Sequence, residues 1–269
     1  MSQELQHSFT FVVPTAGNSN IMERNFFASP CFQGLSKDRF LIQRDFRSAA
    51  EAYNDAIERA NSDLIIFSHQ DMIFPESWLV DLGKAIEWLD TNDQKWGVLG
   101  CYGVTEEGVG QGYIYSPGRG LIGKALQQPI RVQTLDEIVL IIRRSSGLRF
   151  DPDLPHFHLY GTDICLRAAQ LGMMSYAIPA FCIHNAHQYI VLPKEFYDCY
   201  RHIQHKWRDV LPVHTSCLNV TRSNTNLYKR RARELYLQIR RRGFIAPRTE
   251  DVPKLIEDAL VEFLYNRQQ

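Results

Sequence analysis

Two ionisable side chains, His69 and Asp71, follow directly after an apolar run in the stretch DLIIFSHQDMIFP, residues 63–75. A short continuous apolar run such as Leu64–Phe67 is typical of a buried strand. In an open α/β sheet, ligands bind in the crevice beyond the carboxyl ends of the strands. Side chains separated by two positions point to the same side of an extended chain. The stretch therefore predicts a ligand site in which an imidazole and a carboxylate act together.

Strand-like and helix-like segments alternate around this stretch. Besides residues 63–67, strand patterns occupy residues 9–15, 38–46, 95–104, 131–144 and 174–185. Helix patterns with one apolar face occupy residues 48–60, 75–90, 160–172, 193–209 and 251–267. Residues 103–123 are rich in glycine and predict a loop or an irregular hairpin. Alternation of strand and helix predicts an α/β domain of three layers built on a mainly parallel central sheet.

The composition excludes several classes of protein. The 269 residues are 45% hydrophobic and 22% charged, an ordinary balance for a soluble globular protein. Thirty basic and thirty acidic residues give no net charge, so we expect no nucleic-acid partner. The start of the sequence lacks a signal-peptide pattern, and no apolar stretch approaches the ~20 residues of a membrane-spanning helix. Six scattered cysteines without a Cys-x-x-Cys pair predict reduced thiols in a cytoplasmic protein.

The composition changes after Pro212, which predicts a main domain over residues 1–212 and a helical C-terminal extension over 213–269. The segment 228–243 has seven basic residues against one Glu, with an apolar stripe between its arginines. This stripe consists of Tyr228, Ala232, Leu235 and Ile239. Three interpretations stay open: a surface helix docked on the domain, peripheral contact with an anionic membrane, or a clamp on a bound diphosphate. The amphipathic tail, 251–267, could equally cover the domain or form a dimer.

The order of these motifs resembles the GT-A glycosyltransferases. The closest match is the family-2-like group in which His-Gln-Asp, here residues 69–71, replaces Asp-x-Asp after a hydrophobic strand. The segment YGTDICLRAAQLG, residues 160–172, and a strand ending in His184 follow in the expected order. The resemblance runs from about Thr10 to about His187. It implies a GT-A fold and metal-dependent transfer of a sugar from a nucleotide sugar, with UDP favoured, to a saccharide or lipid-linked acceptor.

Transfer of a glycosyl group from such a donor expels a diphosphate, and a divalent cation can neutralise its charge as a Lewis acid. Mg²⁺ needs only one or two protein carboxylates when phosphates complete its shell, and an imidazole ligand shifts the preference toward Mn²⁺. The resemblance assigns metal binding to Asp71, and His184 would complete the shell. His69 is expected to face the ribose or a phosphate. The alternatives are a helix N-cap for Asp71 and a hydrogen-bonded strand end for His184.

The nucleotide site is expected in the loops that follow the first two strands, as in the resembled fold. This nominates Pro14 and Thr15 after the first strand, and Asp45 or Arg44 after the second. Asn54, on the helix before the His-Gln-Asp strand, matches a polar position that faces the nucleotide in many relatives. The alternative for each residue is an ordinary turn or a solvated polar side chain.

The catalytic base is where the sequence departs from the resembled pattern. The family segment often contains acidic-x-Asp, but residues 160–163 here are Tyr-Gly-Thr-Asp, so Gly161 stands where the base is usual. Asp163 could take part in the chemistry or simply cap the following helix. Asp136 and Glu137 are the other carboxylates expected on the acceptor side. The base could come from elsewhere, the reaction could be retaining, or the domain could bind a nucleotide sugar or a partner protein without catalysis.

A zinc hydrolase is the other enzyme class considered, because HFH at 156–158 and HNAH at 184–187 could supply pairs of ligands. Hydrolases of this kind usually carry a carboxylate base beside the ligands, as in His-Glu-x-x-His. The sequence contains no such pattern. The transferase is therefore the favoured interpretation.

Overall fold

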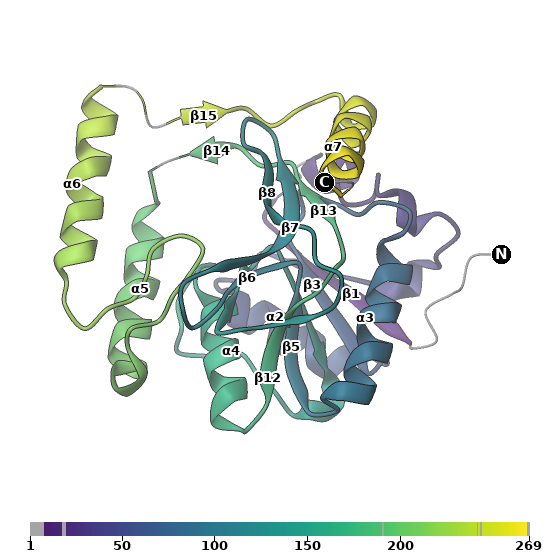
Figure 1. Ribbon diagram of the computed structural model, residues 1–269, viewed down its shortest axis with the longest axis horizontal. Helices are drawn as coiled ribbons and strands as arrows, with labels where there is room; N and C mark the ends of the chain where they lie inside the picture. The colour runs from purple at the N-terminus through teal and green to yellow at the C-terminus, as the bar shows by residue number, and fades with distance from the viewer. Residues whose placement is uncertain (1–7, 18–19, 190, 241, 243, 268–269) are drawn as a thin grey trace.

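A seven-stranded sheet forms the centre of the protein in the computed structural model, which describes residues 8–17, 20–189, 191–240, 242 and 244–267 (Figure 1). In spatial order its strands are β2 (Phe40–Arg44), β1 (Phe9–Thr15), β3 (Leu64–Ser68), β11 (Val139–Arg143), β5 (Trp96–Gly100), β12 (Met174–Ala177) and β9 (Ile130–Val132). Five of them run in one direction, while β11 and β9 run against their neighbours. The predicted α/β class with a mainly parallel sheet is confirmed.

Helices cover both faces of this sheet and give the expected three layers. They are α1 (Ile21–Arg24), α2 (Ala49–Arg59), α3 (Trp78–Asn92), α4 (Tyr160–Gln170) and α5 (Lys194–Lys206). Alternate residues of β3 divide between two cores: Ile65 and Phe67 pack with α2, α4 and α5, whereas Leu64 and Ile66 pack with α1 and α3. This alternation is what a strand buried on both faces requires. Ser48 caps α2 as expected, by accepting a hydrogen bond from the Glu51 amide at 3.2 Å.

A second sheet of six strands stands beyond the carboxyl ends of the first. Its strands are β4 (Met72–Ile73), β6 (Tyr102–Val104), β7 (Gly110–Ser116), β8 (Gly120–Lys124), β10 (Thr134–Leu135) and β13 (Cys182–His184). The glycine-rich segment 103–123 therefore forms paired strands. Three segments expected as single strands are wrong in this respect: 95–104, 131–144 and 174–185 each break where the chain passes between the two sheets. Their apolar runs continue across the break because both sheets are buried.

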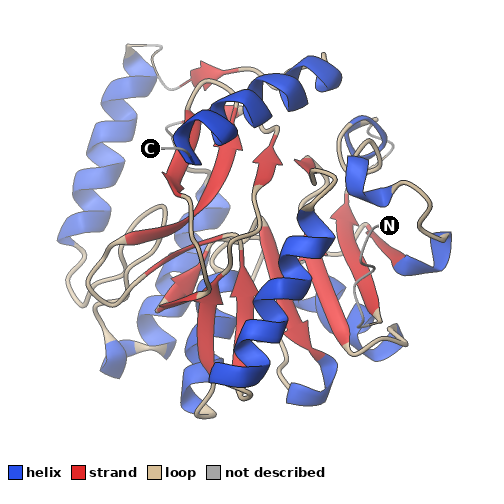
Figure 2. Cartoon of the chain, turned by 45° about the vertical axis from the view of Figure 1, so that its right-hand side comes forward, coloured by secondary structure: helices blue, strands red, loops and turns tan. Residues whose placement is uncertain are grey.

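The C-terminal part contains α6 (Thr225–Ile239), β15 (Phe244–Ala246) and α7 (Val252–Arg267), and β15 pairs with β14 (Gln188–Tyr189). The apolar face of α7 covers the second sheet, where Phe263 stacks on Phe181 with 4.4 Å between ring centroids. Figure 2 shows α7 crossing over these strands. No helix within the described ranges is long and apolar enough to span a bilayer. The domain limits 1–212 and 213–269 stay a prediction.

Candidate metal and nucleotide site

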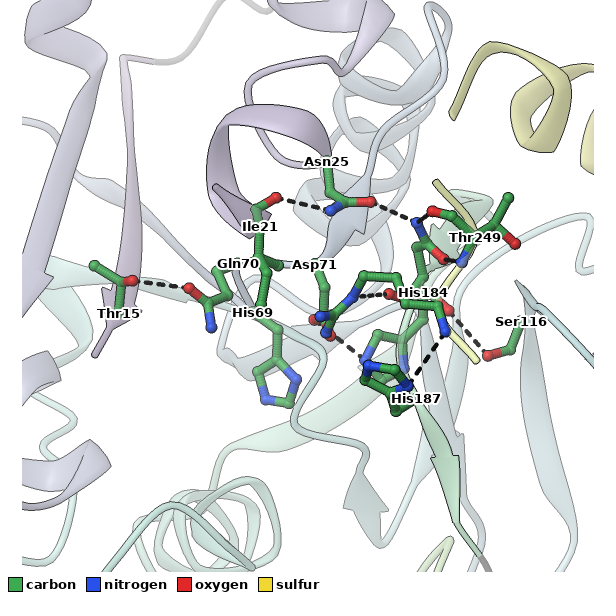
Figure 3. A network of polar contacts seen from close by, with 12 residues as sticks. Thr15, Ile21, Asn25, His69, Gln70, Asp71, Ser116, His184, His187 and Thr249 are labelled. Carbon is green, nitrogen blue, oxygen red and sulfur yellow. Dashed lines mark hydrogen bonds and ion pairs between the residues drawn. The ribbon is translucent and has the colours of Figure 1, made fainter. Parts of the chain in front are cut away.

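Two histidines and one aspartate come together at the carboxyl end of β3 (Figure 3). The antiparallel pairing of β4 with β13 sets Met72 opposite His184, and the Asn185 amide donates to the Asp71 carbonyl at 2.9 Å. One ligand atom from each of His69, Asp71 and His184 lies within 4.8 Å of the other two. The structure thus brings the two residues predicted to bind metal together. It also adds His69, which the sequence had assigned to the ribose or a phosphate.

The imidazole of His69 is held from its Nε2 side by Tyr160, the first residue of α4. The distance from Nε2 to the Tyr160 hydroxyl is 2.9 Å, and that hydroxyl lies 3.1 Å from the Glu137 carbonyl, to which it can donate. The His69 amide also donates to the Ile138 carbonyl at 3.2 Å, which extends the pairing of β3 with β11. Outer partners of this kind fix the orientation of a ligating imidazole.

Burial and charge set the protonation of the three groups. Burial opposes ionisation of Asp71, but His184, His69 and Arg248 outweigh it and hold the pKa of Asp71 well below its usual range. Burial lowers the pKa of His69 even though Asp71 acts in the opposite direction. The pKa of His184 is raised, because Asp71 and Asp136 outweigh burial. Asp71 is therefore a carboxylate, and His69 is a neutral imidazole able to offer a lone pair to a metal.

Arg248 is a member of this site that sequence reasoning missed. Its Nη2 donates to Oδ2 of Asp71 at 2.8 Å, and its Nε donates to the Asn185 carbonyl at 2.7 Å. The next residue, Thr249, exchanges two hydrogen bonds of 2.8 Å with the buried side chain of Asn185. Arg248 lies 177 positions after Asp71, in the segment between β15 and α7. A lone arginine at that separation carries no pattern that could have assigned it.

A cavity of about 290 Å³ opens beside two of the three ligand residues, His69 and Asp71. Pro14 and Thr15, both predicted to contact a nucleotide, line it together with His69. The other lining residues are Ala16, Gln43, Phe46, Gln70, Asp71 and Phe157. The Thr15 hydroxyl donates to Oε1 of Gln70 at 2.8 Å, which ties the end of β1 to the end of β3. The predicted nucleotide loops therefore share one cavity with the metal-ligand group.

The structure places the two other predicted nucleotide residues, Asp45 and Asn54, in different surroundings. Asp45 does not line the cavity, although its neighbour Phe46 does. Asp45 has a positive φ of 59°, and its carboxylate accepts from the Gly17 amide at 3.4 Å. It thereby joins the loops after β1 and β2. Asn54 does not line the cavity, because its side-chain amide exchanges hydrogen bonds of 2.9 and 3.0 Å with the backbone of Phe150. Those bonds hold the chain that leads into α4.

The carboxylate of Asp163 is engaged elsewhere. It accepts from Lys206 Nζ at 2.8 and 2.9 Å and from Trp207 Nε1 at 2.7 Å, and the residue is only 2% exposed. Lys206 also contacts Asp151 at 2.7 Å. These bonds fasten α4 to α5, so the geometry favours a structural role for Asp163 over one in the chemistry.

The space beside Gly161 is already filled. A Cβ at that position would lie 2.8 Å from the Leu135 carbonyl oxygen and 3.1 Å from Cγ of Glu137.

Burial, reinforced by the charge of Asp136, raises the pKa of Glu137 to about 8. Asp136 itself accepts from the Ser216 hydroxyl at 2.7 Å and the Ile138 amide at 3.3 Å. Its negative charge acts to raise the pKa of both imidazoles of the metal-ligand group.

The other histidines that the structure describes do not assemble a zinc site. Among the residues the structure describes, the group of His69, Asp71 and His184 is the single cluster of three potential ligands. His156 lies 3.8 Å from Asp198. The ring of His158 lies against Phe196 at 5.8 Å, and burial lowers its pKa to about 4. The pair at 156–158 is therefore not a ligand pair in this fold.

No protein-family model matches the sequence. One curated relative, "ATP synthase subunits region ORF 6" of Fuscovulum blasticum, is 33% identical over 138 residues, which are 49% of this chain and 55% of that protein. The chain thus spans about half the length of this curated relative. The name of the relative states no activity of its own.

Several solved structures are similar to the chain at low sequence identity. The mannosyltransferase PcManGT from Pyrobaculum calidifontis, in complex with GDP-Man and Mn²⁺, is 15% identical with a TM-score of 0.44, covering 95% of this chain and 70% of that one. TarS of S. aureus is 15% identical with a TM-score of 0.46, and the match covers 75% of this chain and 40% of TarS. GalNAc-T7 with UDP, GalNAc and Mn²⁺ is 10% identical with a TM-score of 0.47, and the match covers 86% of this chain and 55% of GalNAc-T7.

The contact between Arg248 and Asp71 leads to a prediction for metal affinity. Because the guanidinium neutralises a carboxylate that a cation also needs, Arg248→Gln should bind Mn²⁺ more tightly in the absence of nucleotide. We expect a gain of about tenfold, equivalent to ~1.4 kcal/mol, since a hydrogen bond to a charged group contributes ~1.5–3 kcal/mol. Titration of Mn²⁺ followed by electron paramagnetic resonance measures it. Arg240→Gln, at an exposed position on the end of α6, is the matched control, and weaker binding by Arg248→Gln would contradict the prediction.

The raised pKa of Glu137 predicts a dependence of stability on pH. The unfolded chain releases this proton near pH 4.5 and the folded protein near pH 8, so folding stability falls as pH rises between these values. Glu137→Gln removes this titration. Its melting temperature relative to wild type should therefore rise between pH 5 and 8 by at least about 2–4 °C, the shift that accompanies ~1 kcal/mol in a chain of this size. Glu58→Gln, at an exposed position, should show no such trend. A difference in melting temperature between Glu137→Gln and wild type that stays constant from pH 5 to 8 would contradict the prediction.

Proposed function

We propose that the protein is a metal-dependent GT-A glycosyltransferase. It would move a sugar from a nucleoside-diphosphate sugar, with UDP-sugars favoured, to a saccharide or lipid-linked acceptor. The observation that supports this proposal is the group of His69, Asp71 and His184 at the carboxyl end of a central strand, beside a cavity lined by the predicted nucleotide loops. Crevices at this end of an α/β sheet are the usual place for nucleotide ligands.

The donor set fits a divalent cation. Two imidazoles and one carboxylate suit Mn²⁺ better than Mg²⁺, which prefers oxygen ligands. Asp71 is already ionised and His69 neutral, so these two ligands need not lose protons to bind a cation. A bound cation would supply the positive charge that stabilises a departing diphosphate. Arg248 adds a fixed positive charge at the same place.

The neighbouring cavity offers the contacts that a nucleoside needs. Phe46 and Phe157 supply aromatic walls, while Thr15, Gln43 and Gln70 supply polar groups. Its volume of about 290 Å³ is at the lower end of the usual ~300–1,000 Å³ for ligand pockets. Aromatic walls accept any base, so the preference for uridine rests on the family resemblance alone.

Asp136 is the carboxylate we favour as general base. Asp163, the other candidate, is neutralised by Lys206 and by a hydrogen bond from Trp207. In an inverting transfer Asp136 would accept the proton of the acceptor hydroxyl, while the acceptor oxygen bonds to the anomeric carbon and the bond to the diphosphate breaks. The filled space at Gly161 supports a base supplied from the loop that precedes β11.

A non-catalytic domain that holds a nucleotide sugar or a partner protein is the alternative function. It is supported by the same absence of an acidic side chain at Gly161. A domain that only holds a nucleotide sugar also predicts donor binding, so product formation separates it from the enzyme, whereas a domain that only holds a partner protein predicts no donor binding. Three expectations from the sequence belong to this proposal. They are a cytoplasmic location, the domain limits 1–212 and 213–269, and the capacity to form an oligomer.

Calorimetric titration of UDP, GDP and their sugars tests the donor site. We expect binding with Mn²⁺ and its loss with EDTA. Asp71→Asn should weaken Mn²⁺-dependent binding by at least about 100-fold, or ~2.7 kcal/mol, while the domain stays folded by circular dichroism. Asp153→Asn, an exposed aspartate outside the site, is the control and should bind as wild type does. Metal-independent binding, or wild-type affinity in Asp71→Asn, would remove these residues from the donor site.

Asp136→Asn separates catalysis from binding. Loss of a general base should lower turnover by about 10²–10⁴-fold without changing the affinity for the donor. The rates of donor hydrolysis and of transfer to sugar acceptors are measured from the nucleoside diphosphate that is released. Metal-dependent binding with no product in wild type would favour the non-catalytic alternative, whereas equal turnover in the variant would exclude Asp136 as the base.

A further inference from the structure

Helix α6 turns an apolar stripe toward solvent. Tyr228, Leu235 and Ile239 are 66%, 59% and 72% exposed, and Tyr236 beside them is 56% exposed. Residues 228, 235 and 239 recur at the spacing that aligns side chains on one face of a helix. In Figure 1 this helix stands at the edge of the molecule, beyond α5. A docked helix would normally bury this stripe, so its outward orientation needs an explanation.

The face of α6 that packs on the domain explains how the helix is held. Glu234 is 5% exposed and accepts hydrogen bonds from the Tyr197 hydroxyl and from the Leu192 amide, the latter at 3.1 Å. Arg230 neutralises it, with Nε at 2.6 Å. Leu227 is buried beside it on the same face. A buried carboxylate with these partners cannot turn outward without losing them, so the anchor fixes the apolar stripe on the solvent side.

Basic side chains border the exposed stripe on both sides. At 3.6 residues per turn, Lys229 and Arg233 fall on one flank and Arg231 on the other. Arg240 follows directly after the helix and lies over the ring of Tyr236 at 5.6 Å. The acid within α6 is Glu234, which is buried and paired. The outer surface of the helix is thus apolar in the middle and positive at its edges.

A recess of about 440 Å³ lies next to this surface, between α6 and the start of α5. It combines the cations of Lys194 and Arg231 with apolar side chains, among them Val191, Leu192 and Leu235. The combination suits a group that carries a phosphate on an apolar chain. It extends the character of the exposed face into a concave site.

We infer that the outer face of α6 docks on the surface of an anionic lipid bilayer. The apolar stripe would enter the headgroup region, and the basic flanks would meet anionic headgroups. A second copy of the chain fits less well, because a symmetric contact through this face would bring the two sets of cations together. The inference does not depend on the glycosyltransferase proposal, since binding to vesicles needs no donor. If both hold, docking would bring the enzyme to the bilayer that carries a lipid-linked acceptor.

Flotation with vesicles tests this surface in the chain of 269 residues. We expect binding to phosphatidylcholine vesicles that contain about one-third phosphatidylglycerol, little binding to pure phosphatidylcholine, and at least about fivefold weaker binding at ~0.5 M salt. The triple variant Tyr228→Ser, Leu235→Ser and Ile239→Ser should lose at least about tenfold in partition. The double variant Lys229→Gln and Arg233→Gln should lose severalfold and become less sensitive to salt.

Helix α7 provides the matched control, because Val261, Leu264 and Tyr265 are 64%, 55% and 65% exposed. Changing these three residues to Ser should leave vesicle binding unchanged, and circular dichroism should show both triple variants folded. Absence of wild-type binding to anionic vesicles, or equal losses in the two triple variants, would overturn the inference. A dimer in analytical ultracentrifugation that only the α6 variant dissociates would assign this face to a second copy instead.

Discussion

The buried carboxylate of Asp71 is the charge around which the rest of the structure is arranged. Removing an ionised carboxylate from water is costly unless cations and hydrogen bonds compensate it. Here the residue is 8% exposed, and compensation comes from His184 at 3.4 Å and Arg248 at 2.8 Å. These partners belong to segments far apart in the chain. The neutralisation of one side chain therefore requires the central sheet, the second sheet and the C-terminal segment to meet.

This meeting point has a consequence for function. The side chain of Asn185, fully buried, joins the same junction by donating to Oδ1 of Asn25 at 2.6 Å and to the Thr249 carbonyl at 2.8 Å. A divalent cation at Asp71 would compete with the guanidinium of Arg248 for one carboxylate. Occupation of the site and the docking of the segment between β15 and α7 are thus expected to influence each other.

The sequence predicts the long elements and the first half of the site, and its failures have identifiable physical causes. Asp71 could be found because it follows a short apolar run, and His184 because it ends the strand-like segment 174–185. Their pairing could not be derived, since β4 and β13 have two and three residues and show no periodicity. Arg248 is set by tertiary contact alone. The sequence does not predict which face of α6 packs on the domain. An apolar stripe would normally face inward, but the buried Glu234, neutralised by Arg230, takes that position instead.

Pulsed electron paramagnetic resonance of Mn²⁺ bound to the protein in the presence of UDP tests the central claim most directly. The account predicts ¹⁴N couplings from directly bound imidazoles, a ³¹P coupling from the diphosphate on the same ion, and loss of the ¹⁴N signal of one ligand in His184→Ala. A spectrum of Mn²⁺ surrounded by water alone, or ³¹P coupling without any ¹⁴N coupling, would contradict it.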